Sequence, residues 1–348
     1  MIYIKKDWNH LVATLSGLSF GKKAIILTDN IVEGLYYNEI EAILHPIFPY
    51  LSKFVIPNGE SAKNINVLAE ILTAFFDAGL DRSSVVVALG GGVVSDVAGF
   101  AASVYMRGIS YINLPTTFLS QADSSIGGKT GIDFCGTKNL VGTFFKPALI
   151  YSNVATLTDL PKEQYISGLA EVIKYGIIKD CSMFDFIFDN RHKIANRDTH
   201  VLKSILAKCA SIKSAIVAED ERDNGTRQVL NYGHTFGHAI EDLCKYEMPH
   251  GFCIALGMMC AAAFSRNMGR MSVADANKIH DMLNFFGLPT KLPGKYYINA
   301  FDIVNKMRND KKAKNGEITL IISHKIGSAE IICGAEKDTV LAAINEIY

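Results

Sequence analysis

The first half of the chain alternates short runs typical of β-strands with patterns typical of helices, and this alternation constrains the fold most. The strand-like runs lie at residues 22–29, 52–58, 83–89, 110–115 and 148–152. Between the second and third runs, a stretch ending at Gly79–Leu80 places apolar side chains at helical intervals. Strand, helix and strand in this order predict a parallel sheet that helices cover on both faces.

The second half changes character from about residue 160. Helical patterns lie at 167–180, 200–220, 234–246 and 254–269, and the next strand-like run is 318–323. With 348 residues, the chain is longer than the ~250–300 that one core usually holds. We therefore predict an α/β, Rossmann-like nucleotide-binding domain at 1–155 and a mostly α-helical domain at 156–348. Ligands of such folds bind at the carboxyl ends of the strands, so the cleft between the domains is the expected site.

Charge and composition exclude several classes of protein. Lysine plus arginine and aspartate plus glutamate number 35 each, without the basic excess of a nucleic-acid or membrane-surface binder. An anionic ligand would therefore need a local cluster of cations. The longest uncharged apolar run, 251–264, is shorter than the ~20 residues of a membrane span and predicts a buried helix. Seven scattered cysteines and a charged amino terminus indicate a reduced, cytoplasmic protein.

Three glycines, Gly90, Gly91 and Gly92, follow the third strand-like run and precede a helical pattern that starts near Ser95. Glycines would let the backbone approach a pyrophosphate closely, and the amino end of the helix would face the anion. The spacing is not GxGxxG, so a tight turn without a ligand is the alternative. Asp29, at the end of the first strand-like run, could accept hydrogen bonds from a ribose, although aspartate is common in such turns.

The segment 115–133 is polar and broken by glycines, and we expect it to be a long loop. A structureless loop of this length usually has a functional reason. Its hydroxyls and cations suit phosphate binding, whereas the alternative is a solvated surface loop. The polar residues in and around it are Arg107, Thr116, Thr117, Asp123, Lys129, Lys138 and Asn139.

Two histidines four residues apart, His234 and His238, would lie on one face of a helix. A catalytic zinc usually has three protein ligands, so a pair needs a further residue. Glu171 lies in an apolar helical stretch with Lys174 three residues later, and a carboxylate there needs a cationic partner. His250 stands between a proline and a glycine. These three histidines and the glutamate are four candidates for three ligand positions.

Several segments resemble, in order, the signature segments of the 3-dehydroquinate synthase family. They are GGGVVSDVAGFAASVYMRG, PTTFLSQADSSIGGKTGI, KNLVG, SGLAEVIKYG, AEDERDNGTRQVLNYGHTFGHAIE, HG and NDKK, spread over residues 58–312. The resemblance implies a homodimeric cytoplasmic enzyme of the shikimate pathway that uses NAD and a zinc or cobalt ion. Such enzymes convert 3-deoxy-D-arabino-heptulosonate 7-phosphate to 3-dehydroquinate and phosphate. The steps are transient oxidation, β-elimination of phosphate, re-reduction and aldol closure.

The resemblance also implies roles for individual residues. The metal ligands would be Glu171, His234 and His250. The NAD contacts would be Asp29, Asn58, Glu60, Lys63, Gly91, Gly92, Val93, Asp96, Thr116, Thr117, Lys129, Lys138, Thr156, Thr158 and Asp159. The substrate contacts would be Arg107, Asp123, Lys129, Asn139, Lys174, Lys213, Arg227, Asn231, His238 and Lys312.

Three positions depart from the family pattern. Phe252 stands where glutamate usually follows the HG pair, and Ser95 and Thr137 stand where glycines are usual. None of these removes an implied ligand, but Phe252 affects the surroundings of the metal. Outer residues of this kind can change metal affinity or activity ~10–100-fold.

Rival functions share much of this pattern. A different sugar phosphate cyclase would act on sedoheptulose 7-phosphate or glucose 6-phosphate, and a metal-dependent polyol dehydrogenase would release NADH. Arg227 and Lys312 favour the heptulosonate, whose carboxylate needs cations. Phe252 leaves open a catalytically silent, NAD-binding paralogue.

Overall fold

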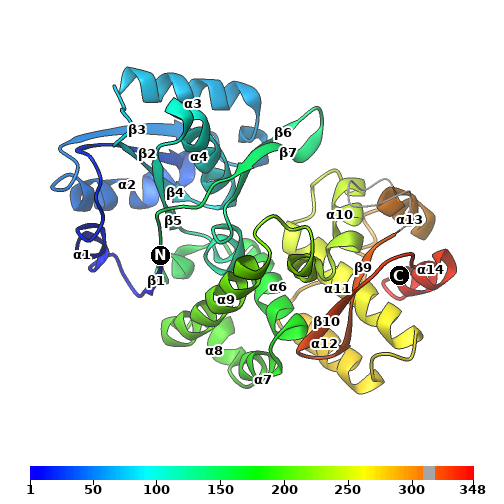
Figure 1. Cartoon of the computed structure of the whole chain (residues 1–348). Helices are drawn as coiled ribbons and strands as arrows, with labels where there is room; N and C mark the ends of the chain where they lie inside the picture. The colour runs from blue at the N-terminus through cyan, green and yellow to red at the C-terminus, as the bar shows by residue number, and fades with distance from the viewer. Residues whose placement is uncertain (309–317) are drawn as a thin grey trace. The chain divides into compact units, whose positions relative to one another are not determined.

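The computed structural model describes residues 1–308 and 318–348. They form two compact units, Met1–Leu160 and Pro161–Tyr348 (Figure 1). The sequence predicted a division after residue 155. The short helix α5 (Thr156–Asp159) belongs to the first unit, because the amides of Val154 and Ala155 just before it donate to the carbonyls of Lys5 and Lys6, at the end of the first strand.

The first unit is built on a six-stranded sheet with the strand order β1-β8-β5-β4-β2-β3. Every neighbouring pair is parallel, so the predicted parallel sheet is confirmed. The strands are β1 (Ile2–Lys5), β2 (Lys23–Asp29), β3 (Tyr50–Ile56), β4 (Val85–Gly90), β5 (Ser110–Pro115) and β8 (Leu149–Asn153). Strand β1 was not predicted; it is a four-residue edge strand whose residues are only half-buried.

Helices cover both faces of this sheet, which explains why β4 is buried along its whole length. Val86 and Ala88 point to the face that carries α3 (Ile65–Asp77) and α4 (Gly92–Val104). Val87 and its alternate neighbours point to the opposite face. That face carries α1 (Leu11–Leu15) and α2 (Asn30–Leu44) (Figure 1).

The strand order places a topological switch between β2 and β4. The chain leaves β2 toward β3 at the sheet edge, then crosses back so that β4 pairs with the other side of β2. Thr28 pairs with Leu89, and Gly90 pairs with Pro115, so these three strands end at the same edge. In open α/β sheets the ligand site lies at such a switch.

The expected long loop at 115–133 is wrong. The segment contains a π-helical turn, Ser120–Ser124, and the first strand of an antiparallel hairpin, β6 (Lys129–Phe134) with β7 (Thr137–Phe144). Gly127 and Gly128 do lie in a loop, but Gly131 is a strand residue that pairs with Gly142 across the hairpin. A Cβ on Gly142 would lie 2.0 Å from the opposite strand's backbone, so these glycines allow the close pairing.

The second unit is mostly helical, as predicted. Its helices are α6 (Lys162–Ile178), α7 (Cys181–Asp189), α8 (Arg191–Ala195), α9 (Thr199–Glu219), α10 (His234–Leu243), α11 (His250–Asn267), α12 (Val273–Phe285), α13 (Ala300–Arg308) and α14 (Lys337–Asn345). It also contains the 3₁₀ turn η4 (Thr226–Asn231) and the antiparallel pair β9 (Leu320–Lys325) and β10 (Ser328–Ile332). Within residues 1–308 and 318–348, no helix has the length and apolarity to cross a membrane.

Glycines allow three of these helices to pack very closely. A Cβ on Gly257 of α11 would lie 1.9 Å from the carbonyl oxygen of Gly233, at the start of α10. A Cβ on Gly251 would lie equally close to the carbonyl oxygen of Ser167 on α6. The Ser167 hydroxyl also accepts a hydrogen bond from the Gly251 amide, at 2.9 Å. Helices α6, α10 and α11, which carry the candidate ligands, are therefore packed closely together.

Candidate functional site

Glu171, His234 and His250 come together from these three helices. Glu171 lies inside α6, and the two histidines are the first residues of α10 and α11. Their ligand atoms all lie within 4.8 Å of one another. The Nε2 atoms of His234 and His250 lie 3.3 and 3.9 Å from Oε1 of Glu171. The arrangement has the three-ligand composition of a catalytic zinc site.

The orientation of His234 points to a cation at this position. Its Nδ1 lies 3.1 Å from the carbonyl oxygen of Tyr232, which can only accept a hydrogen bond, so Nδ1 is the donor. Burial lowers the pKa of His234, which favours the neutral ring with a lone pair on Nε2. That lone pair faces the carboxylate of Glu171. A neutral ring in this orientation and the carboxylate can both bind a cation placed between them.

Glu171 is almost completely buried, at 1% exposure. Burial opposes its ionisation, but the charge of Lys174 outweighs this and holds the pKa of Glu171 well below its usual range. Lys174 forms an ion pair with the carboxylate. Even so, neither carboxylate oxygen has a hydrogen bond of normal geometry within the described part of the chain. Buried carboxylate oxygens of this kind fit a metal ion.

Three cations are buried in this unit. Lys174 pairs with Glu171 on α6, whereas Lys213 lies on α9 and Arg227 on η4, two elements that contact α6. The Arg227 guanidinium donates to the carbonyl oxygen of Glu221 at 2.6 Å, which holds it in place. Lysine and arginine are rarely buried. In a chain with no net charge, this concentration of cations is what an anionic ligand requires.

The remaining predicted substrate contacts of this unit lie near the same cluster or outside the described residues. The ring centroid of His238 is 5.1 Å from that of His234 and 5.9 Å from that of His250, as the spacing of four suggests. Asn231 ends η4, three residues before α10. Lys312 lies outside the described residues.

Glu241 is a residue of this site that the sequence analysis missed. It lies on α10, is 5% exposed, and places Oε2 at 3.2 Å from Nδ1 of His250. Together with His238 and His250 it forms a second group whose ligand atoms lie within 4.8 Å. The available signal was its position three residues after His238, on the same side of the helix.

In the first unit, the glycine turn forms the amino end of α4. Helix α4 begins at Gly92, and no side chain caps it, so the first amides can bind an anion. A Cβ on Gly91 would lie 3.1 Å from Cγ2 of Thr117, and one on Gly92 would lie 3.0 Å from Oγ of Ser124. The hydroxyl of Ser95 donates to the Gly92 carbonyl at 3.0 Å, so it fits where the family usually has glycine. Val93 follows as the second residue of α4.

Lys63 joins several of the predicted residues beside this turn. Its Nζ lies 2.9 Å from Oδ2 of Asp96, 2.5 Å from Oδ1 of Asn139 and 3.6 Å from Glu60. Burial favours the neutral amine, but the charges of Asp96 and then Glu60 raise the pKa of Lys63 above its usual value. Lys138 reaches the same glutamate at 4.0 Å. The hairpin is thereby attached to the switch edge of the sheet.

Other predicted cofactor contacts already hold the backbone at this edge. Oδ1 of Asp29 accepts hydrogen bonds from the amides of Ile31 and Val32 and caps α2. The hydroxyl of Thr156 donates to the carbonyl of Thr116 at 3.0 Å. The other predicted contacts also have partners within this unit: the amide of Asn58 donates to Asn30, the hydroxyl of Thr158 to Ala155, and the hydroxyl of Tyr36 to Asp159.

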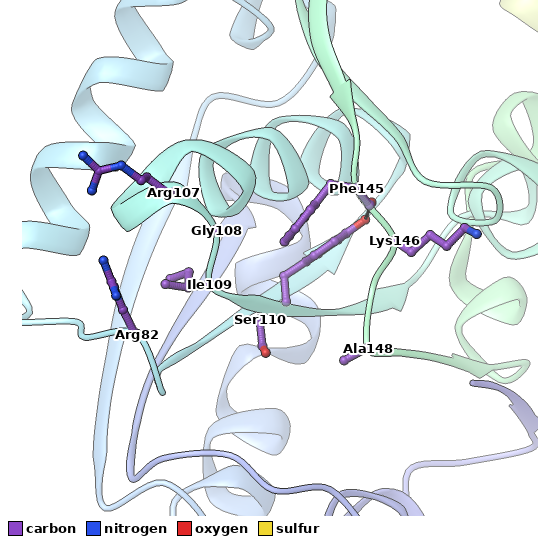
Figure 2. Close-up of a pocket in the computed structure, with 9 residues that line it drawn as sticks. Arg82, Arg107, Gly108, Ile109, Ser110, Phe145, Lys146 and Ala148 are labelled. Atoms are coloured by element: carbon purple, nitrogen blue, oxygen red, sulfur yellow. Dashed lines mark hydrogen bonds between the residues drawn. The ribbon is translucent and has the colours of Figure 1, made fainter. Parts of the chain in front are cut away.

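Arg107 lies at the opposite edge of the sheet from the glycine turn. It follows α4 and precedes β5, so it lies beside the amino ends of the strands. Figure 2 shows it at a cavity of about 330 Å³, with Arg82, Phe145 and Lys146 also in the lining. Within this unit, Arg107 is therefore not brought to the switch edge. The exposed Lys129, in contrast, begins β6, and Asp123 lies in the π-helical turn before it.

The fold is that of the sugar phosphate cyclases. The structure resembles 2-epi-5-epi-valiolone synthase from Streptomyces hygroscopicus, solved with NAD+ and Zn2+, with a TM-score of 0.89 at 24% identity over 100% of this chain and 96% of that one. It also resembles 2-deoxy-scyllo-inosose synthase, solved with carbaglucose-6-phosphate, NAD+ and Co2+, with a TM-score of 0.90 at 24% identity and the same coverage.

Sequence comparison narrows this class to one family. Residues 53–167 match the amino-terminal model of 3-dehydroquinate synthase, and residues 168–313 match the carboxyl-terminal model. A curated 3-dehydroquinate synthase from Acetivibrio thermocellus is 38% identical over 99% of this chain and 94% of its own length. The chain belongs to the 3-dehydroquinate synthase family.

Proposed function

We propose that the chain is a carbon–oxygen lyase that converts 3-deoxy-D-arabino-heptulosonate 7-phosphate to 3-dehydroquinate and phosphate. The observation that carries this proposal is the Glu171–His234–His250 cluster beside buried cations. The curated relatives that match nearly the whole chain are named for this activity. The reaction would supply the shikimate pathway and aromatic amino acid biosynthesis.

Glu171, His234 and His250 would hold one zinc or cobalt ion, and the orphaned carboxylate oxygens and the facing Nε2 atoms fit such an ion. When bound, the ion polarises oxygen and NAD accepts and returns a hydride, so no net oxidation results. Lys174 keeps Glu171 ionised and therefore able to bind a metal. The carbonyl of Tyr232 keeps Nε2 of His234 directed at the same point.

The buried cations would bind the substrate's phosphate and carboxylate. Lys174, Lys213 and Arg227 are held in buried surroundings, where a charge–charge interaction is stronger than in water. Loss of phosphate by β-elimination places negative charge on the leaving oxygen, and fixed cations stabilise that charge. We assign the remaining substrate contacts to Asp123, Lys129, Asn139, Asn231, His238 and Lys312.

The first unit would bind NAD at the switch edge. The uncapped amides of Gly92 and Val93 suit the pyrophosphate, and the free carboxylate oxygen of Asp29 suits a ribose hydroxyl. Lys63 and Asp96 would support this edge through their ion pair. The other proposed NAD contacts are Asn58, Glu60, Gly91, Thr116, Thr117, Lys129, Lys138, Thr156, Thr158 and Asp159.

Asp29→Asn is expected to weaken NAD binding about five- to tenfold without loss of stability. Asparagine caps a helix as well as aspartate does, but it replaces a charged acceptor with a neutral one, and charge-assisted hydrogen bonds are roughly twice as strong. Asp29→Ala should additionally lower the free energy of unfolding by about 1 kcal/mol. Calorimetric titration with NAD and urea denaturation measure the two effects. Equal NAD affinity in Asp29→Asn and wild type would refute the contact, and Asp198→Asn at the cap of α9 is the control.

The substrate assignment is tested by measuring phosphate release from three sugar phosphates. We expect release with the heptulosonate 7-phosphate, at least about 1,000-fold faster in kcat/KM than with sedoheptulose 7-phosphate or glucose 6-phosphate. Those substrates lack the carboxylate and so lose its charge–charge interaction with a buried cation such as Arg227, which is worth several kcal/mol. A preference for either of them would identify another cyclase. Stoichiometric NADH at 340 nm would indicate a dehydrogenase, and no release with added zinc or cobalt would indicate a silent paralogue.

We also infer a homodimer in the cytoplasm. The dimer follows from what the family resemblance implies. The location is supported by the seven cysteines, all of which are free thiols in the structure. Sedimentation and fractionation of cell extracts test these two points.

A further inference from the structure

His250 can present only one nitrogen to a metal, and a hydrogen bond decides which one it is. Its Nδ1 lies 3.2 Å from Oε2 of Glu241, and its Nε2 lies 3.9 Å from Oε1 of Glu171. An ionised carboxylate only accepts hydrogen bonds, so Nδ1 must carry the proton of the neutral ring. This leaves the lone pair of Nε2 directed toward Glu171.

Glu241 lies where burial makes an ionised carboxylate costly. It is 5% exposed, and burying a charged group is costly unless a partner compensates. It reaches His250 from α10, whereas His250 begins α11. The first turn of α11 contains no acidic residue, and Phe252 is its third residue. The negative charge at the amino end of α11 therefore comes from Glu241 on the neighbouring helix. A negative charge at this end interacts favourably with the dipole of α11.

We propose that Glu241 is a positioning residue that fixes the tautomer and ring orientation of His250, so that Nε2 faces the metal. The inference rests on the metal site of the proposed function. It parallels the arrangement at His234, whose Nδ1 is held by the carbonyl of Tyr232. Both histidines then direct Nε2 at Glu171, and each is oriented through its other nitrogen.

A different use of the same residues would be a second metal site. His238, Glu241 and His250 could hold an ion of their own, since their ligand atoms lie within 4.8 Å. That site would take Nδ1 of His250 as a ligand and abolish the hydrogen bond to Glu241. The two arrangements therefore predict different numbers of bound ions, one or two per chain.

The test is a titration of the metal-free protein with cobalt, followed by the visible absorption of the bound ion. The variants are Glu241→Gln, whose amide oxygen still accepts from Nδ1, and Glu241→Ala, which removes the acceptor. Asp242→Asn is the matched control, because Asp242 lies next on α10 but contacts Lys306 and Tyr246 instead. Circular dichroism of the metal-free variants checks that each is folded; if Glu241→Ala is not, Glu241→Leu, which also removes the acceptor but keeps more of the side-chain volume, replaces it.

We expect one cobalt per wild-type chain and about 10–100-fold weaker binding by Glu241→Ala, with an altered absorption spectrum. Glu241→Gln should recover most of the affinity, at most about tenfold weaker than wild type, and Asp242→Asn should match wild type. Wild-type affinity and spectrum in both Glu241 variants, or two ions per chain, would overturn the positioning role alone. A wild-type protein that binds no cobalt would instead overturn the metal site itself.

Discussion

Replacing His234 with alanine is expected to abolish stoichiometric binding of zinc or cobalt and to lower kcat/KM at least about 1,000-fold. The variant loses one of three ligands, and the remaining pair, Glu171 and His250, cannot enclose the ion. A bound ion contributes several kcal/mol of charge stabilisation, which corresponds to this factor. Metal content after dialysis and phosphate release from the heptulosonate phosphate measure the two effects.

Matched histidine variants separate ligands from neighbours. His238→Ala should retain one metal ion per chain but lose turnover, because His238 lies beside the ligand group without belonging to it. His280→Ala should change neither, since His280 pairs with Asp281 at the surface of α12. Wild-type metal content in His234→Ala would contradict the ligand assignment, and metal loss in His238→Ala would favour the alternative group with Glu241.

Gly257→Ala is expected to destabilise the second unit by about 3 kcal/mol and to weaken metal binding with it. The added Cβ would lie 1.9 Å from the carbonyl oxygen of Gly233, a backbone atom that cannot rotate away. Helices α10 and α11 must therefore separate, and they carry the two histidine ligands, His234 and His250. Urea denaturation with and without zinc measures the loss.

The control for this packing is a glycine in a helix with free space around it. Gly34 lies inside α2, and a Cβ there would meet nothing within 4 Å. Gly34→Ala should stabilise the protein by up to ~1 kcal/mol, the difference in helix propensity. If Gly257→Ala unfolds at the wild-type urea concentration and binds metal normally, the close approach of α10 and α11 does not control the site.

Apolar periodicity was sufficient to predict the sheet, because a strand buried on both faces needs a continuous apolar run such as 85–90. The hairpin of β6 and β7 was missed for the opposite reason. Gly131 and Gly142 interrupt the pattern and look like loop residues, although they pair with each other. Their pairing depends on packing against α4, where a Cβ on Gly99 would meet Thr130 at 2.5 Å. Such contacts join residues distant in sequence.

The candidate metal site could likewise be predicted only in part from the sequence. The spacing of His234 and His238 predicts neighbouring rings, and the chemistry of the residues offers four ligands for three positions. Nothing local distinguishes among them, because the choice depends on the packing of α6, α10 and α11. Glu241 was missed because an acidic residue on an amphipathic helix normally faces water, whereas here it is buried and contacts His250 of α11.

Patterns that repeat every two or four residues therefore sufficed to predict the parallel sheet and the helical second half. They also identified the side chains that can bind a metal ion. These features depend on neighbours within one helix or strand. Folding was needed to choose Glu171 as the partner of His234, to place Arg107 at the far edge of its sheet and to give His250 a carboxylate from another helix. These outcomes depend on which elements pack together, and that is a property of distant contacts.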